Sequence, residues 1–167
     1  MDLNRFTQKA QEAIQKSFTI SARYYNQQTD CEHLFLALME QDGGLVSTLL
    51  TNMGADTQEI VRKLEQHLSG LPQVSGPGSE QAYVSQSYNR VLDTADKEAR
   101  SMNDEYVSVE HFLIALLKEK GSPGSRILQE AGVTTETTLQ AIKELRGNRR
   151  ITTENPEDTM EPLKKYG

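Results

Sequence analysis

The residues best suited to chemistry in this sequence are one cysteine and three histidines. Cys31 follows Asp30, where a helix is expected to begin, and a helix N-terminus lowers the pKa of a thiol and so favours a nucleophile. The residue at the equivalent place in a second copy of the same pattern is Val109, which indicates a packing position instead. We therefore expect Cys31 to be half-buried and not catalytic.

His33 and His111 occupy corresponding positions, each directly after a glutamate. A metal site needs several ligands at close spacing, and neither histidine lies in an H-x-x-x-H pattern or beside a cysteine cluster. Both are expected to be hydrogen-bonded or surface side chains near helix N-termini. His67 stands alone on its helix and is expected to face solvent. The sequence therefore predicts no metal site.

Glycine-rich turns occur at Gly43-Gly44 and at 121–124, but neither leads into a Lys-Ser or Lys-Thr pair. The chain has no G-x-x-x-x-G-K-[ST] phosphate loop, so we expect no cofactor and no ATP hydrolysis by these residues. An all-α enzyme stays possible but unsupported, because no nucleophile–base spacing appears. A helical scaffold without affinity for unfolded proteins is another alternative.

Composition narrows the class of protein. With 18 Lys and Arg against 24 Asp and Glu the net charge is −6, which argues against general nucleic-acid binding. The longest apolar runs, 34–39 and 112–117, fall far short of the roughly 20 residues that cross a bilayer, and no secretory signal is evident. A single cysteine suits a reducing compartment. We expect a soluble, cytoplasmic protein without a membrane partner.

The elements that position these residues are written twice. Residues 6–68 align with 84–146 at an offset of 78, without a gap. Matching positions include Glu32-His33 with Glu110-His111, Ala37-Leu38 with Ala115-Leu116, Gly43 with Gly121, and Gly54 with Gly132. Glycines and apolar positions are the ones that determine a fold, so the pattern predicts two tandem copies of one unit.

Each unit reads as four helices with apolar residues at helical spacing. In the first unit these run over about 4–25, 31–41, 45–53 and from 57, and the second unit repeats the plan. Expected N-caps are Asp30, Thr57, Ser108, Thr135, and Ser122 with Pro123 at the first helical position. Leu139, Ile142 and Leu145 should face inward on the last helix. Because no segment alternates with period two for long, no sheet is expected. The predicted fold is all-α, with eight helices as two tandem four-helix repeats related by pseudo-two-fold symmetry.

The domain boundaries follow from glycine and proline. Repeat one is expected over 1–69, a linker rich in both residues over 70–82, and repeat two over 83–146. Residues 147–167 have no sustained apolar stripe and are expected to form an extended tail that packs only if more chain follows.

Several stretches resemble a known family. Arg5-Phe6-Thr7, the segment Asp104-Glu-Tyr-Val-Ser-Val-Glu-His-Phe-Leu113 and the linker Leu71-Pro-Gln-Val-Ser-Gly76 are similar to the Clp N-terminal repeat domain of Hsp100-type AAA+ unfoldases, specifically the ClpB type. The tail 155–167 resembles the segment leading into the first ATPase module of that type.

The resemblance implies a substrate-recruiting domain of an ATP-dependent protein disaggregase. Such a domain binds unfolded or aggregated polypeptide weakly and passes it to an AAA+ ring of the same protein. The parent would be a homohexamer that uses ATP and Mg and works with the DnaK chaperone system, while the isolated domain would be a monomer. The alternative is the adaptor- and substrate-docking domain of a ClpC- or ClpA-like unfoldase that feeds a protease.

Site residues carry over at matching positions. Thr7, Asp104 and Glu110 match positions that the family associates with chaperone activity; the alternatives are a hydrogen bond at a helix start, a loop solubiliser and a partner of the helix dipole. An apolar groove is expected beside the first helix of repeat two, where Val91, Leu92 and Phe112 are candidate lining residues. Core packing is the alternative for these three. The sequence departs from the leucine-rich pattern there at Thr94, Glu98 and His111.

Overall fold

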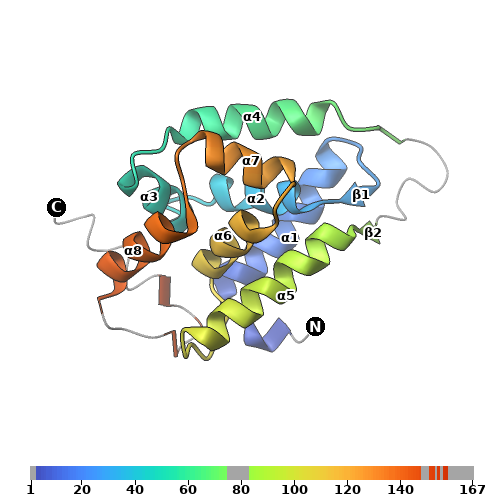
Figure 1. Ribbon diagram of the computed structural model, residues 1–167. Coiled ribbons are helices and arrows are strands. Elements are labelled where there is room, and N and C mark those ends of the chain that lie inside the picture. The colour runs from blue at the N-terminus through green and yellow to red at the C-terminus, as the bar shows by residue number, and fades with distance from the viewer. Residues whose placement is uncertain (1–2, 75–82, 148–150, 153, 155, 158–167) are drawn as a thin grey trace.

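The chain folds into two helical repeats that pack side by side (Figure 1). The computed structural model describes residues 3–74, 83–147, 151, 152, 154, 156 and 157. The first repeat contains η1 (Leu3–Arg5, a turn of 3-10 helix), α1 (Gln8–Arg23), β1 (Gln28–Thr29), α2 (Cys31–Glu40), α3 (Leu45–Asn52) and α4 (Thr57–Ser69). The second contains β2 (Tyr83–Val84), α5 (Gln86–Ser101), α6 (Val109–Lys118), α7 (Pro123–Glu130) and α8 (Thr135–Arg146). The eight predicted α-helices are thus present among the described residues.

Two helices form the centre of the molecule. Every residue of 31–39 on α2 and of 109–117 on α6 is buried. A helix that is apolar nearly all round must be covered on all sides, which is why these two short helices lie inside. In Figure 1 they lie in the middle, with α1 packed on α2 and α5 packed on α6.

A small sheet corrects the expectation of no strands. β1 pairs in parallel with β2, Gln28 opposite Tyr83 and Thr29 opposite Val84, and an isolated parallel bridge joins Phe6 to Val107. At the 78-residue offset, Phe6 corresponds to Val84 and Val107 to Thr29. In each repeat, the segment before the first helix therefore pairs with the segment that precedes the second helix of the other repeat. This reciprocal pairing is what a two-fold axis requires. Strands of two residues are too short to show alternation in a sequence.

A buried carboxylate of the first repeat forms a hydrogen bond to the second, and we call this contact the clasp. Glu32 on α2 is buried, and its Oε2 accepts the backbone N–H of Gly124 in the first turn of α7 at 2.9 Å. The partial positive charge of a helix N-terminus favours an anion there. A Cβ on Gly124 would come within 3.2 Å of the same oxygen, which explains glycine where the first repeat has Val46.

Helix starts differ in part from expectation. Asp30, Ser108 and Ser122 are the predicted N-caps and are confirmed. The predicted caps Thr57 and Thr135 are wrong by one residue, because Asp56 and Thr134 hold those places. The first helix begins after Thr7 rather than at about residue 4, since the Thr7 Oγ1 accepts the Ala10 N–H at 3.1 Å.

Two predicted side-chain orientations are also corrected. Leu139 is 40% exposed instead of inward, because α8 packs through Thr138, Ala141 and Ile142. His67 is half-buried on α4 rather than fully turned to solvent.

The chain after α8 packs against the domain where it is described. Ile151 and Glu157 are 2% and 1% exposed, so the expectation of an unpacked tail is wrong for these residues. Tail residues 148–150, 153, 155 and 158–167 and linker residues 75–82 lie outside the described residues. Within the described ranges, no helix is both long enough and apolar enough to cross a bilayer.

Candidate functional site

Two of the residues singled out by resemblance meet in one buried charge cluster, which we define as Asp104, Glu110, His111 and Arg146. Asp104 lies in the turn before α6, Glu110 and His111 lie in its first turn, and Arg146 ends α8. The Arg146 Nη1 is 3.0 Å from Asp104 Oδ2, and its Nη2 is 2.9 Å from Glu110 Oε2. All four side chains are buried, so Asp104 is not an exposed solubiliser. Glu110 lies in the first turn of α6, where the dipole alternative places it, and it also binds Arg146.

The hydrogen bonds of His111 determine which ring nitrogen carries the proton. His111 Nδ1 accepts the backbone N–H of Ser108 at 2.8 Å, so this nitrogen carries no proton. The Nε2 therefore carries it and donates to Asp104 Oδ2 at 2.7 Å. His111 is thus a neutral capping side chain, which agrees with the expectation of a hydrogen-bonded histidine.

The charges of the cluster support one another. Burial raises the pKa of Asp104, but hydrogen bonds from His111 and Ile151 and the nearby Arg146 outweigh it and leave the pKa below its usual value. Burial likewise acts against ionisation of Glu110, and the Arg146 charge leaves the pKa of that carboxyl lowered as well. Both carboxylates are therefore ionised around one guanidinium at neutral pH.

The geometry superficially matches a hydrolase triad. Ser108 Oγ lies 3.1 Å from His111 Nδ1, and His111 bonds Asp104, the order of a Ser-His-Asp arrangement. However, His111 Nδ1 already accepts a backbone N–H, and Ser108 Oγ donates to Glu110. With Ser108 and His111 both 0% exposed, no substrate reaches them. The arrangement stabilises a helix start and is not a nucleophile.

Thr7 adjoins the cluster through a residue far along the chain. Its Oγ1 donates to Glu157 Oε2 at 2.8 Å, and the same oxygen accepts the Val109 N–H at 3.4 Å. The other oxygen, Oε1, is buried and has no hydrogen-bond partner among the described residues. Burial and the nearby Glu110 charge raise the pKa of Glu157 to about 7.

Arg146 and Glu157 are the residues that sequence reasoning missed. The repeat held a signal for the first, because Arg146 stands where repeat one has the buried Leu68. A charge in place of a core leucine indicates a buried ion pair. No pattern in the sequence marks Glu157, whose partners Thr7 and Val109 lie 150 and 48 residues away along the chain.

The groove residues have a different environment from the one expected. Val91 and Phe112 are 0% exposed, and the Phe112 ring packs 5.9 Å from that of Phe6. These two cannot line an open groove, so core packing describes them, whereas Leu92 is half-buried at the edge of the core. Cys31 is also in the core, its thiol pKa raised by burial.

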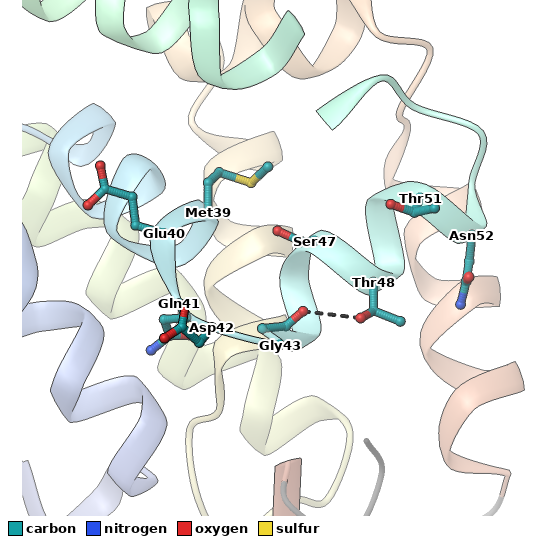
Figure 2. A pocket seen from close by; sticks show the side chains of 10 residues that line it. Met39, Glu40, Gln41, Asp42, Gly43, Ser47, Thr48, Thr51 and Asn52 are labelled. Atoms are coloured by element: carbon teal, nitrogen blue, oxygen red, sulfur yellow. Dashed lines mark hydrogen bonds between the residues drawn. The ribbon is translucent and has the colours of Figure 1, made fainter. Parts of the chain in front are cut away.

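An open depression lies instead on the first repeat, between the end of α2 and α3 (Figure 2). This α2–α3 depression measures about 540 Å³ and is lined by residues 39–44 with Ser47, Thr48, Thr51 and Asn52. Two smaller depressions, of about 300 and 260 Å³, share lining residues with it and extend it towards α4 and α1. The lining exposes polar and apolar surface in similar amounts, although most lining residues are polar; Ala37, Met39 and Val61 are the larger apolar members.

Among the described residues no group of histidine, cysteine and carboxylate side chains is arranged to hold a metal ion. The depression offers hydroxyls, amides, backbone groups and the carboxylates of Glu40 and Asp42, and the cluster is closed to solvent.

Comparison with known proteins agrees with this architecture. The chaperone protein ClpB of Nitratidesulfovibrio vulgaris is 43% identical over 170 aligned residues, covering 100% of this chain and 20% of that protein. ClpB of Bacillus cereus is 37% identical, covering 100% and 19%. The crystal structure of the Hsp104 N-terminal domain from Candida albicans superimposes with a TM-score of 0.78 at 26% identity, covering 90% of this chain and 97% of that domain.

The chain spans about a fifth of the length of the ClpB relatives it matches. The family model for the Clp repeat (R) N-terminal domain matches residues 5–155, nearly the whole sequence. A helical repeat written twice, a clasp between its copies and this match lead to one conclusion: the chain belongs to the Clp repeat N-terminal domain family.

Proposed function

We propose that this chain is the substrate-recruiting domain of an ATP-dependent protein disaggregase. It binds unfolded or aggregated polypeptide weakly and hands it to an AAA+ ring of the same protein. The observation that carries the proposal is the 43% identity to a ClpB chaperone along the full chain. Since the sequence has no phosphate loop, ATP and Mg would be used by other parts of the parent.

The α2–α3 depression supports this function as a place for a client segment. It is open and continuous with two neighbours, so an extended peptide fits along it without being enclosed. A shallow site with a mixed polar and apolar lining gives low affinity and little sequence preference, because few side chains are buried on binding. Weak binding is sufficient if several copies act together in a hexamer, where avidity adds to each contact.

The experiment is an NMR titration of the isotope-labelled chain with a permanently unfolded protein. We expect fast-exchange shifts at Ser47, Thr48 and Thr51, weakened by Thr51→Arg, which adds bulk and charge to the depression. Gln129→Arg is the matched control, because Gln129 is the exposed residue at the equivalent place on α7. A saturating client that moves no resonance would contradict recruitment. Shifts that survive Thr51→Arg unchanged would contradict this location.

The partners proposed for the parent follow from the same family. They are the AAA+ ring, arranged as a homohexamer, and the DnaK chaperone system, with a cytoplasmic location. The isolated chain would be a monomer, which sedimentation equilibrium measures directly.

A further inference from the structure

The chain after α8 returns to the start of the domain. We define the strap as the described residues Ile151, Thr152, Glu154, Pro156 and Glu157. The Glu105 N–H donates to Ile151 O at 2.8 Å, and the Gln8 N–H donates to Glu154 O at 3.0 Å. The Ile151 side chain is buried with the hydrophobic core. The strap is therefore bound by backbone hydrogen bonds at both ends and by an apolar anchor.

Two of the three residues implied by the family resemblance hold this strap, and the third holds the arginine before it. Thr7 donates to Glu157, and Asp104 Oδ1 accepts the Ile151 N–H at 2.8 Å. Glu110 binds Arg146, which lies directly before the connection to the strap. Thr7, Asp104 and Glu110 are 0%, 5% and 1% exposed, so a client cannot touch them while the strap is in place.

We infer that Thr7 and Asp104 are positioning residues that dock the strap, and that the strap is a releasable tether between this domain and the chain that follows it. When docked, it ties residue 157 to the starts of α1 and α6. When released, the eleven residues 147–157 span at most about 40 Å, at 3.3–3.6 Å per extended residue. That release of the strap would serve disaggregation rests on the proposed function, but the docking of the strap does not.

The contacts are balanced in a way that suits release. The strap gains hydrogen bonds from Thr7, Gln8 and Glu105, yet it buries one carboxylate oxygen of Glu157 that has no hydrogen-bond partner within the described part of the chain. A buried polar atom without a hydrogen bond opposes the state that contains it. Glu157 also lies beside the charge of Glu110. Docking is therefore weaker than its number of contacts suggests.

Hydrogen exchange of single amides tests docking on the isolated chain. The amide of Glu105 is the decisive reporter, because its acceptor belongs to the strap and it lies outside α1. At pH 6, Thr7→Ala should lower its protection by about tenfold, the effect of losing one buried hydrogen bond. Glu157→Ala should do the same, and the double variant should lose no more than Glu157→Ala alone, because both remove one contact.

The repeat supplies a matched control. Ser85 caps α5 as Thr7 caps α1, each accepting a backbone N–H at 3.1 Å at the start of a 16-residue helix. Of these two caps, Thr7 donates to Glu157 of the strap, whereas Ser85 makes no hydrogen bond to a described strap residue. Ser85→Ala should therefore leave Glu105 protection within about twofold, an effect of side-chain loss far from the reporter.

Two outcomes would overturn the inference. The first is equal Glu105 protection in Thr7→Ala, Glu157→Ala and the unmodified chain. The second is loss of client-induced shifts in Thr7→Ala while Glu105 stays protected, which would mean that Thr7 contacts the client. Failure of the proposed function gives a different result, because the strap can then be docked in a chain that binds no client.

Discussion

Asn26 and Asp104 hold equivalent histidines in the two repeats, one through a neutral amide and the other through a carboxylate. The Asn26 Oδ1 lies 2.9 Å from His33 Nε2, and the Asp104 Oδ2 lies 2.7 Å from His111 Nε2. Each histidine accepts the backbone N–H of its helix N-cap through Nδ1. The second repeat thus holds its histidine with an ionised carboxylate where the first repeat uses a neutral amide. Arg146 is the additional cation that balances the buried charge of Asp104.

The buried His33 of the first repeat should make the folded chain less stable in mild acid. Burial lowers the pKa of His33 from 6.5 to about 4, so the folded chain resists protonation that the unfolded chain accepts. A lowered histidine pKa contributes stability that is present above pH 6.5 and is lost as the pH falls towards 4. The full loss is on the order of 3 kcal/mol, at 1.36 kcal/mol per pKa unit.

This loss should be measured by urea unfolding between pH 4.5 and 8 in a Glu157→Gln background. The titration of Glu157 changes stability in the opposite direction over this range, because its raised pKa stabilises the folded chain at low pH. Glu157→Gln removes this titration. Adding His33→Gln should then flatten the profile above pH 4.5. An unchanged slope after His33→Gln would contradict this role of His33.

Replacing Arg146 should lower the free energy of unfolding strongly, and replacing its two carboxylate partners as well should restore most of it. Arg146→Leu installs the residue of repeat one but leaves two buried carboxylates without their cation, which should cost about 3–5 kcal/mol of unfolding free energy. Adding Asp104→Asn and Glu110→Gln removes those charges and makes position 104 match Asn26. We expect the triple variant to recover most of the loss in urea unfolding.

The control for this prediction is Arg62→Leu, since Arg62 pairs with Glu59 on the surface of α4. Its unfolding midpoint should barely move, because exposed ion pairs contribute little. If the triple variant were no more stable than Arg146→Leu, the cost would come from packing of the arginine stem instead of from charge.

Much of the fold could be predicted from local chemistry. Glycine is strongly favoured where the backbone is left-handed, and Gly43 with Gly121 and Gly54 with Gly132 have φ angles of 60°, 85°, 83° and 83°. Their recurrence at one offset therefore marks the same turns in both repeats. The apolar runs likewise identified the two central helices, because only a buried helix is apolar nearly all round.

Much less of the site could be predicted. The resemblance selected Thr7, Asp104 and Glu110, but not what they touch, because the partners Arg146 and Glu157 come from remote segments. Helical spacing placed Val91 and Phe112 on an apolar face without distinguishing a groove from the core. Exposure depends on what the rest of the chain covers, and periodicity does not contain that information.

Glu157 predicts that strap docking weakens as the pH rises. Its pKa is raised from 4.5 to about 7 by burial and by the Glu110 charge, so the docked strap favours the protonated acid. A raised carboxyl pKa gives stability that is complete below pH 4.5 and is lost as the pH rises through 7. Between pH 5 and 8, the protection of the Glu105 amide, corrected for its intrinsic exchange rate, should fall by more than about tenfold, which corresponds to one pKa unit of linkage.

Glu157→Gln supplies the sharpest control for this prediction, because the amide imitates the protonated acid and does not titrate. The strap should then stay docked at pH 8, with nearly constant Glu105 protection over the range. Ser85→Ala should keep the pH dependence of the unmodified chain, since it alters a cap but no contact of the strap. Protection that rises with pH, or a pH dependence that persists in Glu157→Gln, would show that another group controls the strap.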